Sequence, residues 1–424
     1  KSIQNPSLEH LSQISKQAQQ VQLSTYHQLF ELNHQKFTDN INLSLSVFHQ
    51  PFSVQQSQFI GEAHFSFTLF KQAVLFYNNT FHQNAFFFNS IFSQPMEMHR
   101  QLFLQSADFM FSQFQSKFML AESIFEKRAL FNGAHFSRHA VIMNNDFHQE
   151  AEFSQAQFDH GAEFIFDQFN HGINLANSTI NDDIRFHQTV LSGPIDLSNM
   201  IIKNGEVDLT EIQPIDPNSK IQIRLVNTNL DQIKLDYHNL ILSFKDNTSQ
   251  NTKEKTYSAL LTKIMATEGH SEDYNRLTIE YKKAVYHEKN QYFTNFIEKH
   301  LWNYGTAKGK AFLWIAYLFF FYSLINTFFY EKLTEGYVEM NLLKEIKMTH
   351  THRMSRFQKL IFLMPYAMIF TLQLFAGRFF KMRDHTKDLH GENIAIITYL
   401  LIIPISGYLF GLFIMLNFIK GASS

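Results

Sequence analysis

The chain has 424 residues, of which 47 are Phe and none is Cys, and its formal net charge at pH 7 is −2. The absence of cysteine excludes disulfides, thiolate metal sites and cysteine nucleophiles. The nearly neutral charge argues against a surface that binds nucleic acid, and the length predicts two or three domains.

Residues 1–28 form a polar, Gln-rich opening segment in which Leu8, Leu11 and Ile14 stand at helical spacing. The segment lacks the apolar core of a secretory signal. The repeats that follow would expose their core and strand edges if the first turn were uncovered. We therefore predict an N-terminal helical cap over residues 1–28.

From Phe37 to Leu197 a large apolar residue returns at every eleventh position, and a second such series runs six residues behind the first. Another, usually smaller residue stands two positions before each of these anchors. On a helix, anchors six residues apart would lie on nearly opposite sides, whereas in a strand residues i and i−2 share one face. The pattern therefore predicts short strands stacked into a solenoid. The predicted core includes Phe59, Phe70, Phe81, Phe103, Phe114, Phe136, Phe158 and Phe169.

The triplets Ala63–Phe65, Ala85–Phe87, Ala151–Phe153 and Ala162–Phe164 resemble units of the pentapeptide-repeat family, in the variant where five- and six-residue units alternate. This resemblance implies a right-handed quadrilateral β-helix with about 22 residues per turn. We expect a mainly β solenoid of this kind over residues 29–245. Its last turn is predicted from a five-residue rhythm at Leu225, Leu230, Leu235 and Leu240.

Apolar residues change to helical spacing from Tyr257 onward, which predicts an α-helical linker over residues 256–305. The segment Trp302–Lys310 resembles the junction before the first membrane helix in a subgroup of pentapeptide-repeat proteins. It is not a phosphate loop, because the gap between Gly305 and Gly309 is one residue too short for that motif.

Three hydrophobic segments, 311–330, 360–377 and 394–419, end the chain and predict an α-helical transmembrane domain over residues 306–424. Lys308 and Lys310 favour a cytoplasmic start for the first segment. The middle segment either re-enters the bilayer, which leaves two spans, or crosses it as a third. We expect a multi-pass protein of the inner (cytoplasmic) membrane of a bacterium, with the lipid bilayer as a partner and the β-helix in the cytoplasm.

The order of these segments resembles the two-transmembrane, one-pore-helix plan of potassium channels. The resemblance makes Thr371, Gln373 and Gly377 candidates for lining a pore, although residues 371–378 do not match the potassium filter motif. Hydrogen bonding between packed helices is the alternative role for Thr371 and Gln373.

The third hydrophobic segment contains Pro404, Gly407 and Gly411. Proline kinks helices, and two glycines four residues apart allow close helix packing. These three residues are therefore candidates for helix packing or for gating.

The sequence leads to three functional hypotheses. The first is a homo-oligomeric ion channel or pore with the β-helix as an assembly, sensing or partner-binding domain. The second is a non-conducting membrane scaffold that recruits a protein partner through the β-helix. The third, imitation of DNA to inhibit a topoisomerase, is suggested by an excess of roughly nine acidic residues over positions 29–245. We predict no catalytic residues, no metal ligands and no cofactor.

Overall fold

A computed structural model describes residues 2–3, 24–269, 271–329 and 355–376, and between 399 and 412 all residues except 400, 401, 404 and 410. The chain divides into two compact units, Lys1–Leu277 and Thr278–Ser424. Each unit is described by itself below.

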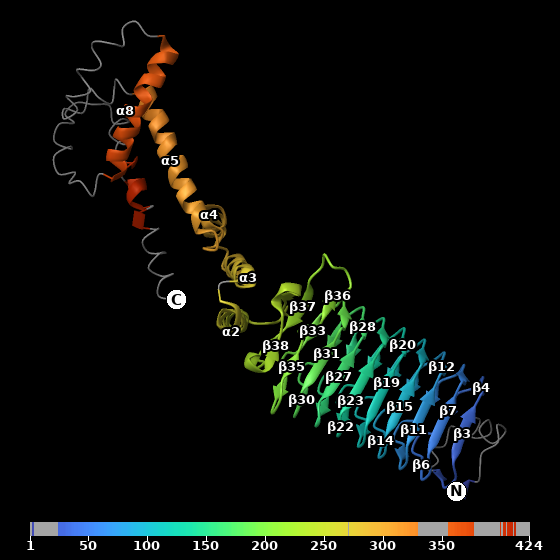
Figure 1. The fold of residues 1–424 in the computed structure, drawn as a ribbon. Helices are drawn as coiled ribbons and strands as arrows, with labels where there is room; N and C mark the ends of the chain where they lie inside the picture. Colours follow the sequence, from blue (N-terminus) through green and yellow to red (C-terminus); the bar gives the residue numbers. More distant parts are fainter. Residues whose placement is uncertain are drawn as a thin grey trace. The chain divides into compact units, whose positions relative to one another are not determined.

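The first unit is a β-solenoid with four parallel sheets, and each turn adds one short strand to each sheet (Figure 1). One turn consists of β2 (Thr25–Tyr26), β3 (Phe30–Asn33), β4 (Lys36–Phe37) and β5 (Ile41–Asn42), which we assign to sheets A, B, C and D. Three of the sheets have ten strands and sheet C has nine, which gives about ten turns. The predicted β-solenoid is therefore confirmed, and its geometry is consistent with pentapeptide repeats.

The regular turns have 22 residues. Phe70 pairs with Phe48 in the turn before it and with Phe92 in the turn after it. Because side chains in register lie directly above one another, the anchors of one sheet stack as rings: the centroids from Tyr26 to Phe158 in sheet A are 4.6 to 5.2 Å apart. All eight Phe expected in the core are at most 1% exposed.

Two of the four corners are turned by residues with a positive φ angle. At the corner between sheets D and A these include residues 45, 67, 89, 111, 133, 155, 177 and 199, and at the corner between sheets B and C they include 34, 56, 78, 100, 122, 144, 166 and 188. The backbone N–H of each described corner residue in the regular turns bonds to the next turn, as Phe67 N does to Phe88 O at 2.8 Å. The path of the backbone is therefore fixed here with little help from the corner side chains, which point outward.

The N-terminal segment begins with a strand. β1 (Ser2–Ile3) pairs in parallel with β2 and extends sheet A by one strand. A helical cap was expected over residues 1–28, but both β1 and β2 fall inside that range as strands, and residues 4–23 lie outside the described part. The solenoid thus starts before residue 29.

The last turns depart from the 22-residue repeat. Ile195 pairs with Ile223, 28 residues later, because an exposed loop at 215–220 is inserted. The predicted anchor Leu235 is only half-buried, whereas Ile233 and Tyr237 are fully buried. Two short 3₁₀ turns, η1 (Leu230–Gln232) and η2 (Tyr237–Asn239), shift the inward positions away from the five-residue rhythm. The strands of these last turns are β34 (Ile201–Ile202), β35 (Val207–Asp208), β36 (Gln213–Pro214), β37 (Ile221–Arg224), β38 (Ile233–Lys234) and β39 (Leu240–Leu242).

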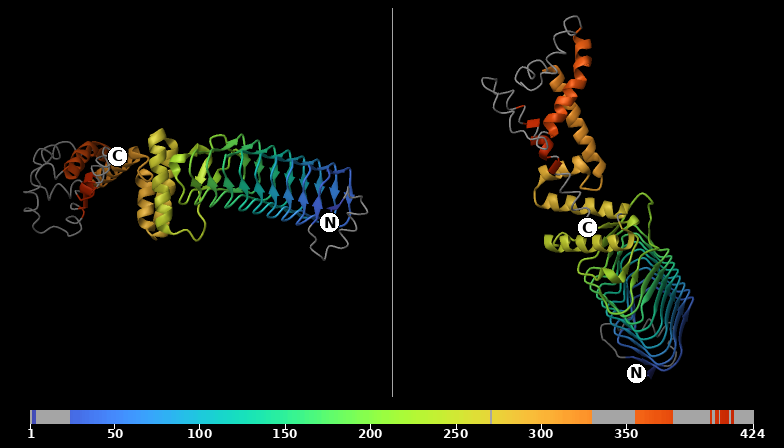
Figure 2. Two further views of the ribbon diagram at one scale, coloured as in Figure 1. Left: turned by 90° about the horizontal axis from the view of Figure 1, so that it is seen from below. Right: turned by 60° about the vertical axis from the view of Figure 1, so that its left-hand side comes forward.

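Helix α2 (Gln250–Glu268) covers the end of the solenoid (Figure 2). Its N-terminus is capped by Ser249, whose Oγ accepts from Thr252 N. Leu260 and Ile264 on its inner face are at most 1% exposed. A solenoid needs such a cover because its terminal core and strand edges are otherwise exposed.

Helix α3 (Glu272–Glu288) follows, and Arg276 near its start binds the last turn of the solenoid, which we call the last coil. The Arg276 guanidinium donates to His238 O at 2.8 Å, to Leu240 O at 3.1 Å and to Tyr237 O. It also lies over the Tyr237 ring, 4.8 Å from the centroid. These carbonyls end the last turn, so Arg276 takes the place of a further strand.

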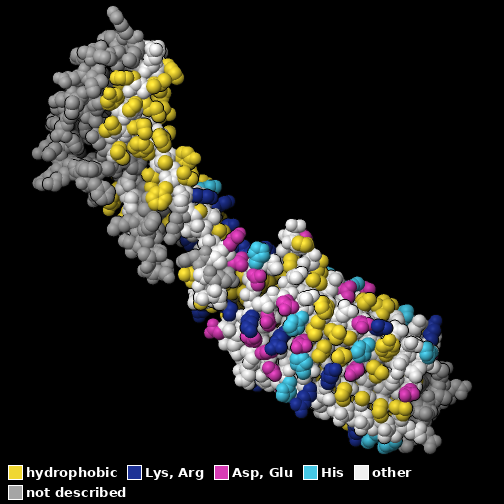
Figure 3. Space-filling view, in the orientation of Figure 1, with side chains coloured by type: hydrophobic (Ala, Val, Ile, Leu, Met, Phe, Trp, Pro, Cys, Tyr) yellow, Lys and Arg dark blue, Asp and Glu magenta, His cyan; other side chains and the backbone are white. Residues whose placement is uncertain are grey.

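The second unit contains the rest of α3, then α4 (Tyr292–Trp302), α5 (Lys308–Phe328) and α8 (Arg356–Ala376), with further helical residues between 399 and 412. Within the described residues one stretch, Gly309–Phe328, is long and apolar enough to cross a membrane, and the apolar stretch in α8, Leu360–Ile369, is shorter. The expected multi-pass arrangement is not shown by these helices. The visible described surface of α5 and α8 is largely hydrophobic, whereas the visible solenoid face mixes all types of side chain (Figure 3).

Candidate functional site

Three aromatic side chains, Phe67, Phe88 and Phe111, run along the corner between sheets D and A. Phe67 and Phe111 are each 49% exposed, and the half-buried Phe88 lies between them. The ring centroids are 5.4 Å apart for Phe67 and Phe88 and 5.7 Å apart for Phe88 and Phe111, in edge-to-face contact. We call these three residues the aromatic ladder. They belong to neither anchor series, which is the signal that could have found them in the sequence.

The backbone of the ladder is unfavourable for Phe. Phe67 and Phe111 have φ angles of 57° and 58°, in the left-handed region that bulky residues rarely enter. This conformation costs an ordinary residue about 1–2 kcal/mol, and Asn tolerates it better. Asn does occupy the same corner at positions 89, 177 and 199. Folding alone therefore favours Asn over Phe at positions 67 and 111.

The ladder lies in a strip without charge. The six residue pairs 44–45, 66–67, 88–89, 110–111, 132–133 and 154–155 at this corner contain no Asp, Glu, Lys or Arg. Gly133 ends the ladder, because a Cβ atom there would approach the Phe111 ring to 2.7 Å. We call these pairs the uncharged strip. Such a strip is suited to contact with another apolar surface.

The corner between sheets B and C has a different character. Arg100 Nε donates to Glu122 Oε2 at 2.5 Å, and Arg100 Nη1 donates to Tyr77 OH at 3.1 Å. Phe166 is a single exposed Phe at this corner, 55% exposed with a φ of 55°. Phe166 therefore has the same residue type and backbone conformation as Phe67 and Phe111 but lies outside the aromatic ladder, which makes it a control position.

Histidines on the outer faces of the sheets pair with carboxylates. His148 contacts Glu126 and Asp146, both at 3.0 Å. Burial works to lower the pKa of His148, but the hydrogen bonds with Asp146 and Glu126 outweigh it and raise the pKa above the usual 6.5. Across the described residues, no three His, Asp or Glu side chains gather in a way that could hold a metal ion.

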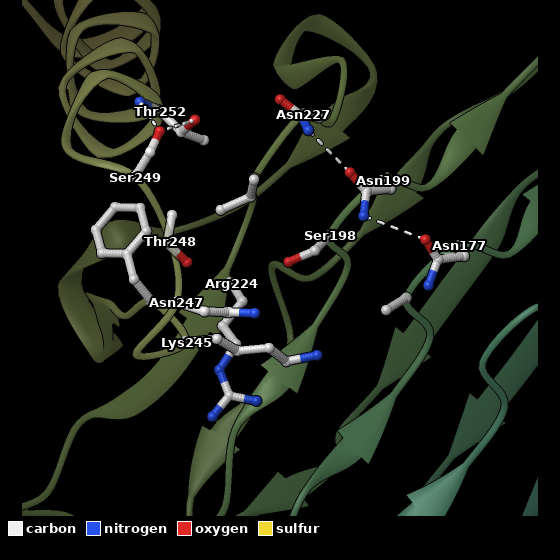
Figure 4. A pocket seen from close by; sticks show the side chains of 13 residues that line it. Asn177, Ser198, Asn199, Arg224, Asn227, Lys245, Asn247, Thr248, Ser249 and Thr252 are labelled. Carbon is white, nitrogen blue, oxygen red and sulfur yellow. Dashed lines mark hydrogen bonds between the residues drawn. The ribbon is translucent and has the colours of Figure 1, made fainter.

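A polar cleft of about 350 Å³ lies between the last turns of the solenoid and the start of α2 (Figure 4). Asn177, Asn199 and Asn227 line it as a hydrogen-bonded row, with distances of 3.1 and 2.9 Å. Lys245 Nζ lies 2.9 Å from the buried carboxylate of Asp196, which also contacts Arg224 at 3.5 Å.

Asp196 offsets part of the positive charge of this cleft. Burial would raise the pKa of Asp196, but hydrogen bonds from Ser198 and Lys245 outweigh it and lower the pKa. Because the charged carboxylate is paired with both Lys245 and Arg224, it offsets one of the two positive charges and weakens the attraction of the cleft for an anion. These contacts instead tie the inserted last turn to the solenoid.

A polar cluster joins the apolar helices of the second unit. Asn326 in α5 donates through Nδ2 to Thr371 Oγ1 in α8 at 2.8 Å, and Tyr399 OH donates to Asn326 Oδ1 at 2.9 Å. Asn326 and Thr371 are completely buried. Thr371 also donates to Ala367 O, one turn earlier, at 2.7 Å. Three segments distant in sequence are thus held together by one amide.

The predicted pore and packing residues are only partly described. Thr371 lies in the polar cluster, whereas Gln373 is in α8 but its side chain lies outside the described residues, as do Gly377 and Pro404. Gly407 and Gly411 are both helical. Apart from its chain neighbours and the backbone of its own helix, no described atom lies within 4 Å of a Cβ built on Gly411. Asn326 was not predicted, and an amide inside an uncharged apolar segment is the signal that could have found it.

Comparison of the chain with profiles of protein families, with curated protein sequences and with solved structures finds no match in any of the three.

Proposed function

We propose that the chain is a membrane-anchored assembly protein, in which the aromatic ladder binds the ladder of a second copy. The observation that carries this proposal is the exposure of Phe67 and Phe111 in a conformation that Phe disfavours. Phe166 stands alone at its corner, whereas Phe67 and Phe111 are joined through Phe88 in an uncharged strip, and this combination motivates the hypothesis of a contact outside the chain. The proposal assigns the chain no catalytic step, cofactor or nucleic-acid partner.

The uncharged strip favours a second copy as the occupant. In a two-fold symmetric dimer the same patch meets itself, so any charge would face a like charge near the axis. The strip has none from Ser44 to Gln155. Anchoring in one membrane would also concentrate the copies, which allows a small apolar surface to associate.

Helix α5 is the proposed anchor. It is 21 residues long, and outward-facing apolar side chains along it include Tyr317, Phe321 and Phe328, each more than half exposed. Side chains of this kind are stable in lipid and costly in water. Lys308 and Lys310 at its start favour a cytoplasmic solenoid and an inner-membrane location.

The oligomeric state of the full chain in detergent tests the assembly. We expect wild-type protein to be oligomeric and the double variant Phe67→Asn with Phe111→Asn to shift to monomer, as measured by size-exclusion chromatography with light scattering. Asn already occupies this corner in other turns, so the variant should fold. Phe166→Asn makes the same change at the other corner and should remain oligomeric. A monomeric wild type, or a double variant of unchanged mass, would refute the proposal.

The polar cluster favours ion conduction by the assembled helices as a second candidate function. Asn326, Thr371 and Tyr399 place an amide and hydroxyls among apolar helices, where polar groups commonly mark an ion path or a helix contact. The order α5, α8 and the helical residues after 399 also fits the potassium-channel-like plan that the sequence resembles.

Flux through liposomes distinguishes conduction from anchoring alone. Under the channel hypothesis, reconstituted protein passes monovalent cations and Thr371→Val changes the rate or selectivity. Leu372→Val alters the neighbouring, 58% exposed side chain and serves as the control. Absence of flux from the intact oligomer would leave the non-conducting scaffold.

A further inference from the structure

Helix α4 presents an exposed apolar face. Tyr292, Phe293, Phe296 and Ile297 are 61, 77, 60 and 39% exposed. At 3.6 residues per turn these four side chains and His300 span an arc of about 140° on one side of the helix. A cluster of this size is unusual on a surface that faces only water.

The opposite side of α4 is fixed by polar contacts. Glu298 accepts from Trp302 Nε1 at 2.9 Å and pairs with Lys282 of α3 at 3.3 Å. Lys282 Nζ also donates to Tyr304 O at 2.9 Å, and Tyr304 OH donates to Asn295 Oδ1 at 2.6 Å. Trp302 and Tyr304 are buried beneath these contacts. The helix therefore cannot rotate its aromatic face inward without breaking this network.

The same helix leads directly into the proposed membrane anchor. Only residues 303–307 separate α4 from α5, and Asn303, Tyr304 and Gly305 turn the chain with positive φ angles. Trp314 Nε1 of α5 donates to His300 O of α4 at 2.9 Å. If α5 enters a bilayer at Lys308, α4 must lie at the level of the lipid headgroups.

The charge around α4 fits an anionic membrane surface. Between residues 282 and 310 the chain has six Lys, no Arg and two Glu, and Glu298 is already paired with Lys282. Lys299 is exposed within α4, and the exposed Lys289 precedes the first aromatic residue, Tyr292, by three positions. Basic residues at an interface attract anionic lipids, and amphipathic helices with aromatic faces insert at the boundary between headgroups and acyl chains.

We infer that α4 is an interfacial helix, whose aromatic face inserts among the headgroups and which binds anionic phospholipid. This inference rests on the proposed role of α5 as a membrane anchor. It adds a second, lateral contact with the bilayer, which would hold the start of the anchor at a fixed depth.

Site-directed spin labelling tests the inference, because the natural chain has no cysteine. Full-length protein carries one cysteine at a time: Phe293→Cys on the aromatic face, Thr294→Cys on the exposed polar side of the same helix, or Phe320→Cys in α5. It is reconstituted into vesicles of phosphatidylcholine with or without phosphatidylglycerol. Accessibility to oxygen, which concentrates in lipid, is compared with accessibility to a water-soluble nickel complex.

We expect the label at 293 to favour oxygen and the label at 294 to favour nickel, with 293 moving deeper when phosphatidylglycerol is present. A label at 320 in lipid together with a water-exposed label at 293 would overturn the inference and leave the anchor intact. A water-exposed label at 320 would overturn the anchor itself. Equal shielding of 293 and 294 would indicate burial in a protein contact and would overturn the interfacial role, and equal depth in the two lipid mixtures would refute anionic binding.

Discussion

Replacement of Asp167 by Asn is expected to stabilise the protein, and by more at high pH than at low pH. Asp167 is completely buried, and its carboxylate accepts from Asn145 N at 2.8 Å, from Asn145 Nδ2 at 2.9 Å and from Ile165 N at 3.1 Å. These donors are neutral. Burial outweighs them and raises the pKa of Asp167 from 3.8 to about 7.

The raised pKa of Asp167 determines how stability changes with pH. The unfolded chain loses this proton above pH 3.8, whereas the folded chain keeps it until about pH 7. Stability therefore falls as the pH rises from 3.8 to 7 and is constant above that. The full loss is about 4 kcal/mol, of which roughly a third has occurred at pH 5.

Asn at position 167 removes the ionisable group and is compatible with the fold, because Asn is found at the equivalent position of other turns. Asn79 and Asn145 occupy equivalent positions and donate Nδ2 to Val54 O and Leu120 O at 2.8 and 3.0 Å. An Asn at 167 can donate in the same way, but it leaves Ile165 N with a poorer acceptor, which costs about 1 kcal/mol. The net gain at pH 8 is therefore about 3 kcal/mol, which corresponds to a rise in Tm of roughly 6–12 °C for a domain of this size.

Thermal unfolding of the full chain in detergent, followed by circular dichroism at pH 5 and pH 8, measures this gain. Asp159→Asn is the control, because burial tends to raise the pKa of Asp159 but hydrogen bonds from Gln157 and His135 outweigh it and lower the pKa. That variant should gain no stability at either pH. An equal gain for Asp167→Asn at both pH values, or a loss at pH 8, would show that the buried negative charge of Asp167 does not destabilise the fold.

Three further outcomes are expected, two in stability measurements and one in amide hydrogen exchange. Phe114→Ala removes one ring from the stack in sheet A and should lower the free energy of unfolding by about 3–5 kcal/mol, whereas Phe114→Leu keeps most of the apolar volume and should cost less; equal costs would show that the lost volume does not set the cost. His148→Gln should lower the Tm below pH 6.5 and lose that effect as the pH rises through the raised pKa of His148; a constant effect would exclude its ion pairs as the cause. Arg276→Lys keeps the charge but cannot reach several carbonyls, so amide hydrogen exchange at residues 237–242 should accelerate, and unchanged protection would show that Arg276 does not hold the last coil.

The sequence predicts the solenoid because its anchors repeat without interruption, but it hides which anchors are neighbours. Successive anchors eleven residues apart lie on different sheets, and contacts join residues 22 apart. Ser57, Asn79, Asn145 and Asp167 therefore form one buried row beside sheet C, while the residues that alternate with them belong to sheet A. When the sequence is read as a single series, these positions resemble the small residues that stand two before each anchor. Asp167, the charged residue among them, then does not stand out.

The end of the solenoid was less predictable for a related reason. Five-residue spacing assigns Leu235 to the core, yet 3₁₀ turns tighten the chain so that Ile233 and Tyr237 point inward instead. The contacts of Arg276 with this coil involve backbone carbonyls, which no side-chain pattern reveals. Contacts of Asn326 with Thr371 and Tyr399 likewise join segments whose separation of 45 and 73 residues carries no periodic signal.

The position of a Phe in this chain decides what its presence means. An inward Phe is explained by the core it joins, since each ring is buried against inward side chains of the adjacent turns. A Phe at a left-handed corner gains little burial and opposes the local backbone preference, so packing within the chain does not explain it. Corner positions accept many residue types because the backbone there is held by bonds between turns. Phe67 and Phe111 stand where such freedom exists and Asn would fold better, which makes them the strongest indication of a contact with another molecule on the solenoid.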